Sequence, residues 1–345
     1  MVKRTYVVLL NWRGWRDTVA CLETVFASVG VNLRVVVCDN DSGDGSLERI
    51  ADWADGQLDA GVPDNSRLAG LMRGLSRRPV WQRITRKAAE VGEVSPEADL
   101  ILVENGGNLG FAAGNNVGLR LALAQDDMDC VWLLNNDTLV EPGCLRAMRR
   151  KLKLYGDRAA CGSVIHFFDQ PEIIQALGGN RFNSVTGIAA CSEGRFLHES
   201  ATVDVEAVSS GLSYLSGCSM LLPRAFLEEV GLMNEDYFLY YEEIDWFTRS
   251  GGRFPLCIAG NARLYHREGS SIGSPGWQRA ASRFADEQLY RSRLIFMRRY
   301  HPHWLPLCYA MSLLEAAKHA LRGRFANASA VLSVLFGRSR AGVPG

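Results

Sequence analysis

The feature of this chain that most limits its fold is a fourfold alternation of short apolar runs with helix-like segments. The apolar runs are "TYVVLLN", "LRVVVCDN", "DLILVEN" and "CVWLLNND". Each has the length of a strand and little polar alternation, which is typical of strands buried on both faces in a parallel sheet. Between them lie segments with helical spacing, namely Asp17 to Ala27, "SLERIADWA" and Phe111 to Ala124. Repeated strand–helix units predict a doubly wound α/β domain with a mixed, mainly parallel sheet flanked by helices.

All four apolar runs end in asparagine or aspartate. The carboxyl ends of parallel strands open into the crevice where ligands bind, so the Asn and Asp residues that follow these strands would face one site. We call these residues the polar exits of the strands. Turn chemistry is the alternative for any single exit, because Asn and Asp are common turn residues. Four such exits are hard to attribute to turns alone. We interpret them as one crevice formed by Asn11, Asp39 with Asn40, Asn105, and Asn135 to Asp137.

The composition is that of a folded globular protein, with 47% hydrophobic and 22% charged residues among 345. The nine cysteines include no C-x-x-C pair and several lie in apolar runs. This favours buried thiols over disulfides or zinc ligands and indicates a reducing, cytoplasmic setting. No apolar run has transmembrane length, and the run Tyr6 to Leu10 is too short for the core of a signal peptide.

The net charge is zero, but basic residues are concentrated in two segments. Residues 66–87 contain seven Lys or Arg and no acid, and residues 291–345 contain nine against the single acid Glu315. Such patches suit an anionic membrane surface, an acidic polymer or nucleic acid, and solvated helix faces are the alternative. The first patch lies in residues 56–98, which interrupt the strand–helix rhythm. We expect an insertion there, with a basic amphipathic helix around Leu68 to Lys87.

Beyond residue 155 the pattern is mixed. Strands are expected near Cys161 to Phe168 and Tyr214 to Leu222, a helix over Arg224 to Val230, and several helices from Asp286 onward. The last segment combines its basic residues with apolar stretches such as "WLPLCYAMSLL". We expect these helices to contact an anionic membrane surface peripherally. The alternative is that their apolar residues pack onto the preceding domain or onto a second subunit, as in a homo-oligomer.

The stretch "ENGGNLGFAAGNNVGL" combines glycines with Asn108, Asn115 and Asn116 at a strand-to-helix turn. Glycines there let a ligand approach the backbone, and the helix N-terminus favours an anion. The stretch has neither G-x-G-x-x-G nor G-K-[ST], so it indicates neither a dinucleotide fold nor an NTPase phosphate loop. Two adjacent amides in an apolar helix need partners if buried, and we expect a ligand to supply them, with capping or packing as the alternative.

The segment "FLYYEEIDWFTR" places Glu242, Glu243 and Asp245 at the expected start of a helix, among aromatic residues. Acids at a helix N-terminus are also stabilised by the helix dipole, which is the purely structural explanation. Clustered carboxylates beside aromatic rings also fit a site that binds a polar ligand and takes a proton from it, and we favour this explanation.

Six motifs carry a family resemblance: "VVLLNWRGW", "VVVCDNDSGDGS", "NGGNLGFAAGNNVGL", "WLLNNDTLVEPGCL", "SGCSMLLPRAFLEEVGLMNEDYFLYYEEIDWFTR" and "ARLYHREGSSIG". They look like, in order, the motifs of inverting family-2 glycosyltransferases of the GT-A fold, and most like the rhamnosyltransferase-like branch that assembles bacterial cell-surface polysaccharides such as O-antigen. The resemblance covers about residues 5 to 273. It implies a GT-A domain over 1–273, with 56–98 as a basic insertion, and a helical extension over 274–345.

The resemblance implies a metal-dependent transfer from a nucleotide sugar, dTDP-rhamnose or a UDP-sugar, to a glycan or lipid-linked glycan. Asp137 and His266 would hold Mn²⁺ or Mg²⁺, with Asn135 as a further ligand where the family often has aspartate. Hard cations prefer oxygen ligands and offset the charge of a departing diphosphate. The resemblance also implies a nucleotide-sugar site formed by Asn11, Asp39, Asn40, Asn108, Gly110, Asn115, Asn135 and Asn136.

Within that site, Asp39 would accept a hydrogen bond from N3–H of uracil or thymine. We expect Asp44 and Ser46 to cap the following helix, which leaves Asp39 free. Glu243 aligns with the catalytic base of the family, which commonly has aspartate there, and Glu242 and Asp245 complete the catalytic set. In inverting transfer the base takes the proton of the acceptor hydroxyl, whose oxygen attacks the anomeric carbon opposite the diphosphate.

Two other classes of protein are the alternatives. A nucleotidyltransferase of similar fold is expected to show a G-G-x-G-T-R-like loop near the N-terminus, where this chain has "LNWRGWR". A non-catalytic glycan-binding scaffold would not need Asp137, His266 and Glu243 together. No nucleic-acid partner is expected.

Overall fold

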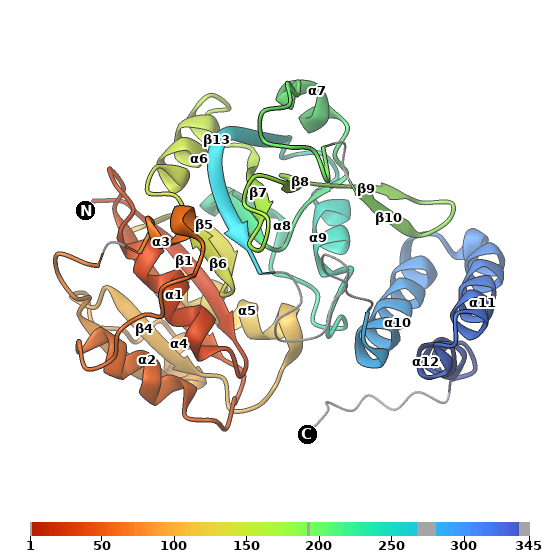
Figure 1. Ribbon diagram of the computed structural model, residues 1–345, viewed down its shortest axis with the longest axis horizontal. Helices are drawn as coiled ribbons and strands as arrows, with labels where there is room; N and C mark the ends of the chain where they lie inside the picture. The colour runs from red at the N-terminus through yellow and green to blue at the C-terminus, as the bar shows by residue number, and fades with distance from the viewer. Residues whose placement is uncertain (1, 73, 192–193, 268–280, 338–345) are drawn as a thin grey trace.

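The computed structural model describes residues 2–72, 74–191, 194–267 and 281–337 (Figure 1). Over these residues it contains a large sheet and a small one. The strands are β1 (Arg4–Asn11), β2 (Leu33–Asp39), β3 (Trp81–Thr85), β4 (Leu100–Glu104), β5 (Met128–Asn135), β6 (Thr138–Val140), β7 (Ala160–Phe167), β8 (Ile174–Leu177), β9 (Gly179–Asn183), β10 (Ile188–Cys191), β11 (Tyr214–Leu215), β12 (Ser219–Pro223) and β13 (Leu256–His266).

The large sheet has the order β3-β4-β2-β1-β5-β12-β7-β13-β6, with β8 paired to β7. The small sheet has the order β10-β9-β11. From β3 to β5 the strands are all parallel, and β12 then joins antiparallel to β5 and β7. The four strands predicted from the apolar runs are therefore β1, β2, β4 and β5, and the predicted mixed, mainly parallel α/β architecture is confirmed.

Helices cover both faces of the large sheet, because successive strand side chains point to opposite faces. Tyr6 and Val8 of β1 pack with α5, α8 and α9, whereas Val7 and Leu9 pack with α1, α2 and α6. The helices are α1 (Trp15–Phe26), α2 (Ser46–Ala54), α3 (Ser66–Ala69), α4 (Arg86–Glu90), α5 (Gly110–Leu123), α6 (Cys144–Lys153), α7 (Val205–Ser210), α8 (Arg224–Val230), α9 (Glu242–Ser250), α10 (Arg283–Tyr300), the 3₁₀ helix η1 (Pro302–Trp304), α11 (Leu305–Leu321) and α12 (Phe325–Leu335).

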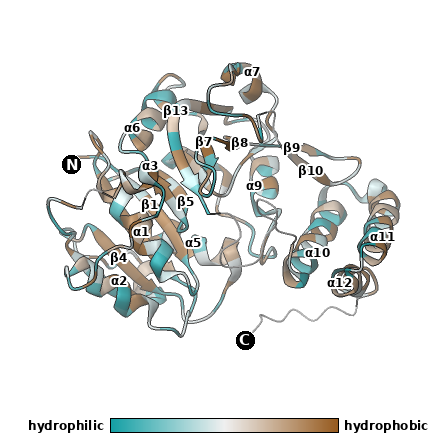
Figure 2. Cartoon of the chain, viewed as in Figure 1, coloured by the Kyte–Doolittle hydropathy of each residue, from teal (hydrophilic) through white to brown (hydrophobic). Residues whose placement is uncertain are grey.

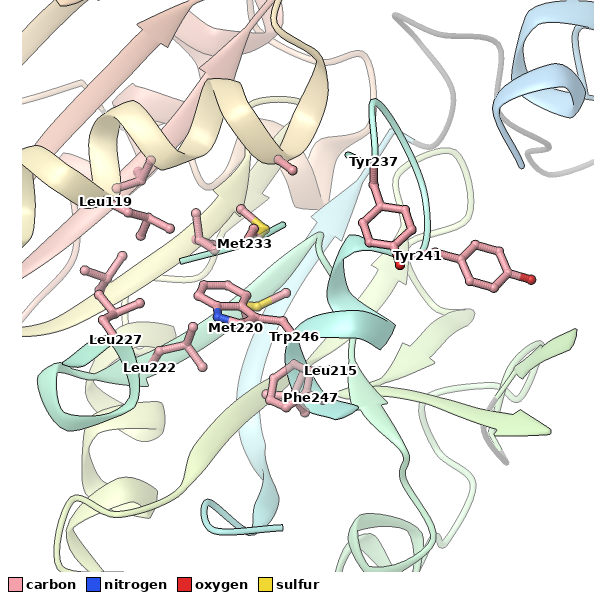
Figure 3. Close-up of a cluster of buried hydrophobic side chains, with 14 of the residues drawn as sticks. Leu119, Leu215, Met220, Leu222, Leu227, Met233, Tyr237, Tyr241, Trp246 and Phe247 are labelled. Carbon is pink, nitrogen blue, oxygen red and sulfur yellow. The ribbon is translucent and has the colours of Figure 1, made fainter. Parts of the chain in front are cut away.

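The apolar layer that contains Tyr6 and Val8 holds α9 in place. Figure 3 shows Trp246 of α9 pointing among Met220 and Leu222 of β12 and Met233. Its indole nitrogen also donates to the carbonyl of Gly231 at 2.8 Å. The start of α9, which carries the predicted catalytic acids, is therefore anchored by a buried aromatic side chain.

The register of the parallel strands brings the predicted polar exits to one edge. Asn11 lies opposite Asp39 across β1 and β2, and Leu10 lies opposite Asn135 across β1 and β5. Strand β13, from the opposite half of the large sheet, contributes His266, which pairs with Thr138 of β6. The short turn between β5 and β6 thereby meets the end of β13.

The predicted basic helix over Leu68 to Lys87 is wrong. The chain instead forms α3, the edge strand β3 and α4, and β3 pairs in parallel with β4 from Trp81↔Leu100 to Thr85↔Glu104. A strand forms because Ile84 is buried in the sheet layer while Gln82 and Arg83 remain accessible. Residues counted as an insertion thus complete the large sheet.

The basic residues of this segment are largely matched by acids from elsewhere in the fold. Arg67, for example, makes two hydrogen bonds to Glu199, of 2.7 and 2.9 Å. This pairing explains the local excess of positive charge without an anionic partner. Further pairs are Arg77–Asp99, Arg78–Glu23, Arg83–Glu48, Arg83–Glu104 and Arg86–Glu90.

The C-terminal part consists of α10, α11 and α12, which lie together at one end of the molecule (Figure 1). Helix α10 is attached to the loop that leads into α9: the Ser292 hydroxyl donates to the carbonyl of Leu239 at 2.8 Å, and the Phe296 ring packs against Tyr241. The expected helices after Asp286 are confirmed. The predicted domain boundary at 273/274, the end of the last motif and the terminal segment 338–345 lie outside the described residues.

Eight cysteines in the described part of the chain are free thiols, and all eight are buried. This agrees with the expectation drawn from their spacing. Among the helices of the described segments, none is both long enough and apolar enough to cross a membrane.

Candidate active site

A cavity of about 420 Å³ opens at the carboxyl ends of β1 and β5 and extends to α9 and α10. It gathers seven of the predicted site residues, from four separate parts of the chain. Apolar and aromatic side chains, including Trp12, Tyr214, Tyr240 and Leu289, complete its wall. The predicted residues that line it are Asn115, Asn135, Asn136, Asp137, Glu242, Glu243 and His266.

The predicted metal ligands meet at one side of this cavity. His266 Nε2 lies 3.1 Å from Asp137 Oδ1 and 3.3 Å from Asn135 Nδ2. On the other side of the ring, His266 Nδ1 lies 3.0 Å from Gln175 Oε1, which fixes the orientation of the imidazole. Burial lowers the pKa of His266, but the neighbouring Cys218 and Asp137 outweigh it and hold this pKa well above its usual value.

This donor set fits a divalent cation in type. A carboxylate oxygen and an imidazole nitrogen are common ligands, and the Asn135 amide presents its oxygen at the same place after a half-turn of the amide group. Within the described residues no group of three His, Cys, Asp or Glu side chains could hold an ion. A cation here would therefore draw its remaining ligands from a bound donor and from water.

The predicted nucleoside residues form a hydrogen-bonded network just behind the cavity wall. Asn11 Nδ2 donates to Asp39 Oδ1 at 2.6 Å, and Asn136 Nδ2 donates to Asn11 Oδ1 at 3.3 Å. Asn105 Nδ2 donates to Asn40 Oδ1 at 2.8 Å, and Asn40 Nδ2 donates to the carbonyl of Gly110 at 3.0 Å. The polar residues that end the four strands are thus linked by hydrogen bonds, but Asn11, Asp39, Asn40 and Asn105 are buried and do not line the cavity, so their contact with a ligand stays a prediction.

Asp39 is not free, contrary to the expectation. Asp44 does accept from the backbone and hydroxyl of Ser46, but Ser42 binds Asp39 through its backbone N–H at 3.0 Å and its hydroxyl at 2.6 Å. Ser42 follows Asp39 closely enough to fold back onto it, a local contact that the sequence pattern did not reveal. A carboxylate has further lone pairs, so contact with a base stays a prediction.

The glycines of the glycine-rich stretch mainly allow α5 to pack closely on β1, and not a ligand to approach the backbone. A Cβ added to Gly114 would lie 2.6 Å from Leu10 Cδ1, and one at Gly118 would lie 2.7 Å from Val8 Cγ1, so both glycines let α5 pack closely on β1. Gly110 has φ +79° and faces the carbonyl of Phe238. Asn108 Oδ1 accepts from the Gly110 N–H at 3.1 Å and orders this turn.

The two adjacent amides of α5 have different environments. Asn116 exchanges hydrogen bonds with the backbone of Met233, 2.9 Å to its carbonyl and 3.1 Å from its N–H. The ligand contact expected for it is therefore replaced by a structural one. Asn115 bonds the carbonyl of Phe111 at 2.9 Å and lines the cavity, so its predicted role stays open to test.

The acids of α9 follow an unusual backbone. Tyr240 and Tyr241 both have left-handed conformations, with φ of 67° and 69°, a geometry that costs energy for residues other than glycine. It turns the chain so that Glu242 and Glu243 reach the cavity. Glu243 Oε1 accepts from the backbone N–H of Gly217 at 3.1 Å, and a Cβ at Gly217 would lie 2.4 Å from that oxygen.

Glu242 and Glu243 titrate as an interacting pair. Burial raises the pKa of Glu242 well above its usual value, and the charge of Glu243 raises it further. Burial also raises the pKa of Glu243, although backbone N–H groups and a hydrogen bond from Glu242 partly offset this. Glu243 is half-buried whereas Glu242 is buried, so the pair favours a protonated Glu242 beside an ionised, accessible Glu243.

Known proteins share this architecture. Residues 84–201 match the family model described as glycosyl transferase family 2. The mannosyltransferase PcManGT from Pyrobaculum calidifontis, in complex with GDP-Man and Mn²⁺, superposes with a TM-score of 0.52 at 14% identity, over 98% of this chain and 87% of that one. GalNAc-T7 with UDP, GalNAc and Mn²⁺ gives 0.54 at 12% identity, over 91% and 51%. The chain has the GT-A fold.

A curated relative adds a match in sequence. The low-salt glycan biosynthesis hexosyltransferase Agl10 of Haloferax volcanii is 25% identical over 167 residues, which are 47% of this chain. The match spans only half the length of that relative. In this GT-A chain the family match includes Asn135, Asn136 and Asp137 but ends before Glu243 and His266.

Asp245 lies outside the cavity of the GT-A domain, which argues against the catalytic role expected from the sequence. It is fully buried and accepts from Arg249 at 2.7 Å, from the hydroxyl of Tyr300 at 2.9 Å and from that of Tyr237 at 3.2 Å. Asp245 lies two residues after Glu243 in a helix, so its side chain points to another face. It joins α9 to α10 rather than meeting a substrate.

We expect Asp245→Asn to lower stability without abolishing the chemistry. Loss of the charge weakens the hydrogen bonds of the fully buried Asp245 to Arg249 and the two tyrosines, which should reduce the free energy of unfolding by about 1–3 kcal/mol. The matched control is Asp236→Asn, which breaks an accessible pair with Arg299 and should cost less than about 1 kcal/mol. Urea unfolding measures both. A large loss of kcat with unchanged stability would instead return Asp245 to the catalytic set.

Sequence reasoning missed Gln175, Gly217 and Cys218. Gln175 lies in β8, where nothing in the local pattern distinguishes it from a structural residue. Gly217 and Cys218 belong to the motif beginning "SGCSM", but only the fold shows that they face Glu243 and His266. Proximity across the sheet was the missing signal.

Proposed function

We propose that this protein is a metal-dependent, inverting glycosyltransferase that moves a sugar from a nucleoside-diphosphate donor to a glycan or lipid-linked glycan. The observation that carries the proposal is that Glu243 and the pair Asp137 and His266 line the same cavity. A general base and an anion-neutralising centre in one enclosed space are what transfer from a diphosphate requires.

The donor would lie along the carboxyl edge of β1, β2 and β5. There the network of Asn11 and Asp39 would meet the base, and Asn135 with Asp137 would lie near the diphosphate. A bound Mn²⁺ or Mg²⁺ would neutralise negative charge on the leaving group. PcManGT and GalNAc-T7 have structures with Mn²⁺ and with GDP-Man or UDP, which supports a metal and a nucleotide-sugar donor here. dTDP-rhamnose or a UDP-sugar is the proposed donor.

Glu243 would act on the acceptor. Its carboxylate is oriented by Gly217 N–H and accessible from the cavity, so it can take a proton from a bound hydroxyl. As the O–H bond breaks, the oxygen attacks the anomeric carbon and the diphosphate leaves on the opposite face. The transferred sugar therefore inverts its configuration. Tyr240, Tyr241 and Tyr214 provide aromatic surface for sugar rings in the same cavity.

A panel of nucleotide sugars tests the proposal. Thermal unfolding would be followed with dTDP-rhamnose, UDP-glucose, UDP-GlcNAc and GDP-mannose, each with Mn²⁺ or with EDTA. We expect one donor to raise the melting temperature only with metal, because a ligand at about 100 times its Kd adds about 2.7 kcal/mol. The product formed from that donor should be a nucleoside diphosphate and a sugar of inverted configuration. Release of pyrophosphate from a nucleoside triphosphate and a sugar 1-phosphate, with formation of the nucleotide sugar, would favour a nucleotidyltransferase, and no donor binding or hydrolysis would favour a scaffold.

A further inference from the structure

Helix α11 exposes its apolar side. An ordinary surface helix turns polar residues to solvent, but among the exposed residues of α11 only Lys318 is charged. Leu314 and Leu321 are 62% and 88% exposed. The buried side carries small or polar residues, Cys308, Ser312 and Ala316. The remaining exposed residues are Pro306, Leu307, Ala310, Leu313 and Ala317.

Helix α12 continues this surface. Phe325, Leu332 and Phe336 are exposed and recur at helical spacing, which places them on one side of the helix. Leu321 and Phe325 flank the turn between α11 and α12, and this turn contains the exposed Arg322 and Arg324. Figure 2 shows the apolar colouring of α11 and α12 at the end of the molecule formed by the helical extension. We call these exposed faces and their turn the α11–α12 surface.

The α11–α12 surface is connected rigidly to the active site. Helix α10, on which both helices pack, places Leu289 in the wall of the cavity. The same helix is hydrogen-bonded to the loop before α9 through Ser292, and its Phe296 ring packs against Tyr241. A partner bound at this surface would therefore be held at a fixed position relative to the cavity mouth.

Charge decides between a second copy and a lipid surface. Residues 291–337 contain seven Lys or Arg and one acid, Glu315, which is paired with Lys318 at 2.6 Å. In a two-fold dimer the same surface meets itself, so Arg322 and Arg324 of both copies would face like charges. Anionic lipid headgroups complement these cations while the acyl region accepts the apolar side chains.

We infer that the α11–α12 surface docks onto an anionic lipid bilayer. The helices would lie in the interface with Leu314, Leu321 and Phe325 inserted and Arg322 and Arg324 at the headgroups. The inference deepens the proposed function and rests on it for one point only, that a lipid-linked acceptor then reaches the cavity from the membrane beside α10.

Cosedimentation of the full chain with vesicles tests this docking. Vesicles of phosphatidylcholine with about 30% phosphatidylglycerol should bind the protein, and pure phosphatidylcholine should bind it much less. Raising NaCl from about 0.05 to 0.5 M should weaken binding, because salt screens the attraction between the arginines and the anionic headgroups. We expect Leu314→Glu with Leu321→Glu to lower the partition coefficient by at least roughly tenfold.

The control is Leu154→Glu, since Leu154 is 78% exposed at the end of α6, outside the helical extension. It should bind vesicles as wild type does. Equal binding by Leu154→Glu and the double variant, or none by wild type at low salt, would overturn the inference. A wild-type dimer that the double variant abolishes, without vesicle binding, would overturn it in favour of a second copy. Donor hydrolysis in solution should be unchanged in the double variant, so a failure of docking is distinct from a failure of the proposed activity.

Discussion

Glu243→Gln is expected to lower kcat by roughly two to four orders of magnitude, the usual worth of a positioned proton acceptor. The amide is nearly isosteric and still accepts from Gly217 N–H, whose distance to Glu243 Oε1 is 3.1 Å. It cannot take a proton from the acceptor hydroxyl. Donor affinity should be unchanged, because this side chain faces the acceptor. Steady-state kinetics with the donor identified by thermal shift, together with donor titration, measure both effects.

Glu242→Gln is the matched control, and the fold sharpens what it should show. Burial and the charge of Glu243 hold the pKa of Glu242 well above its usual value, which favours its neutral form. A glutamine resembles this neutral, hydrogen-bond-donating group closely. We therefore expect a loss of less than about tenfold, far smaller than that of Glu243→Gln.

The pH profile provides a second readout of Glu243. The base must be ionised, and burial raises its pKa, so kcat/KM should fall as pH drops through a value above that of an ordinary Glu. This acid limb should persist in Glu242→Gln and disappear in Glu243→Gln. If the acids only stabilised the helix terminus, each change would cost about 0.3–1 kcal/mol of stability and leave turnover intact. A Glu243→Gln enzyme with wild-type kcat and a lower melting temperature would support that alternative.

The sequence was informative where burial alone decides structure. Strands β1, β2, β4 and β5 are buried on both faces, so each appears as a continuous apolar run that needs no knowledge of its neighbours. Their parallel pairing then brings the polar exits together. The predicted site came from this logic and from the motifs, and the cavity gathers Asp137, His266 and Glu243 as both require.

The sequence was misleading where partners come from distant parts of the chain. The basic run around Arg67 and Arg83 suggested an anionic partner, whereas Glu199, Glu48 and Glu104 supply the charges. Asp245 was assigned to the catalytic set because it is close to Glu243 in sequence. Arg249 follows Asp245 by four residues in the same helix, and this spacing was a local sign of an ion pair. The roles of the cavity residues in binding and chemistry stay predictions that mutagenesis must test.

Asp137→Ala is expected to abolish metal-assisted binding of a nucleoside diphosphate and to lower kcat/KM by roughly a thousandfold or more, since several kcal/mol of charge neutralisation is lost. Asp137 is the only carboxylate within the predicted ligand set of Asn135, Asp137 and His266, so no other member of that set can take over its charge. The fold should persist, because Asp137 lies in the turn after β5 and not in either apolar layer. Titration calorimetry of UDP, dTDP and GDP with and without Mn²⁺ measures the effect independently of turnover.

Two further variants make the Asp137 result specific. Glu206→Ala removes a carboxylate that is 65% exposed on α7 and does not line the cavity, and it should leave the Mn²⁺ dependence unchanged. His266→Ala should weaken metal-assisted binding more mildly than Asp137→Ala, because water can replace one neutral ligand. Its effect should appear at limiting Mn²⁺ and shrink at saturation. If Mn²⁺ enhanced diphosphate binding by Asp137→Ala as much as by wild type, the cation would have to be held elsewhere. The cavity would then hold the base Glu243 without a cation site for the leaving diphosphate, which contradicts the proposed function.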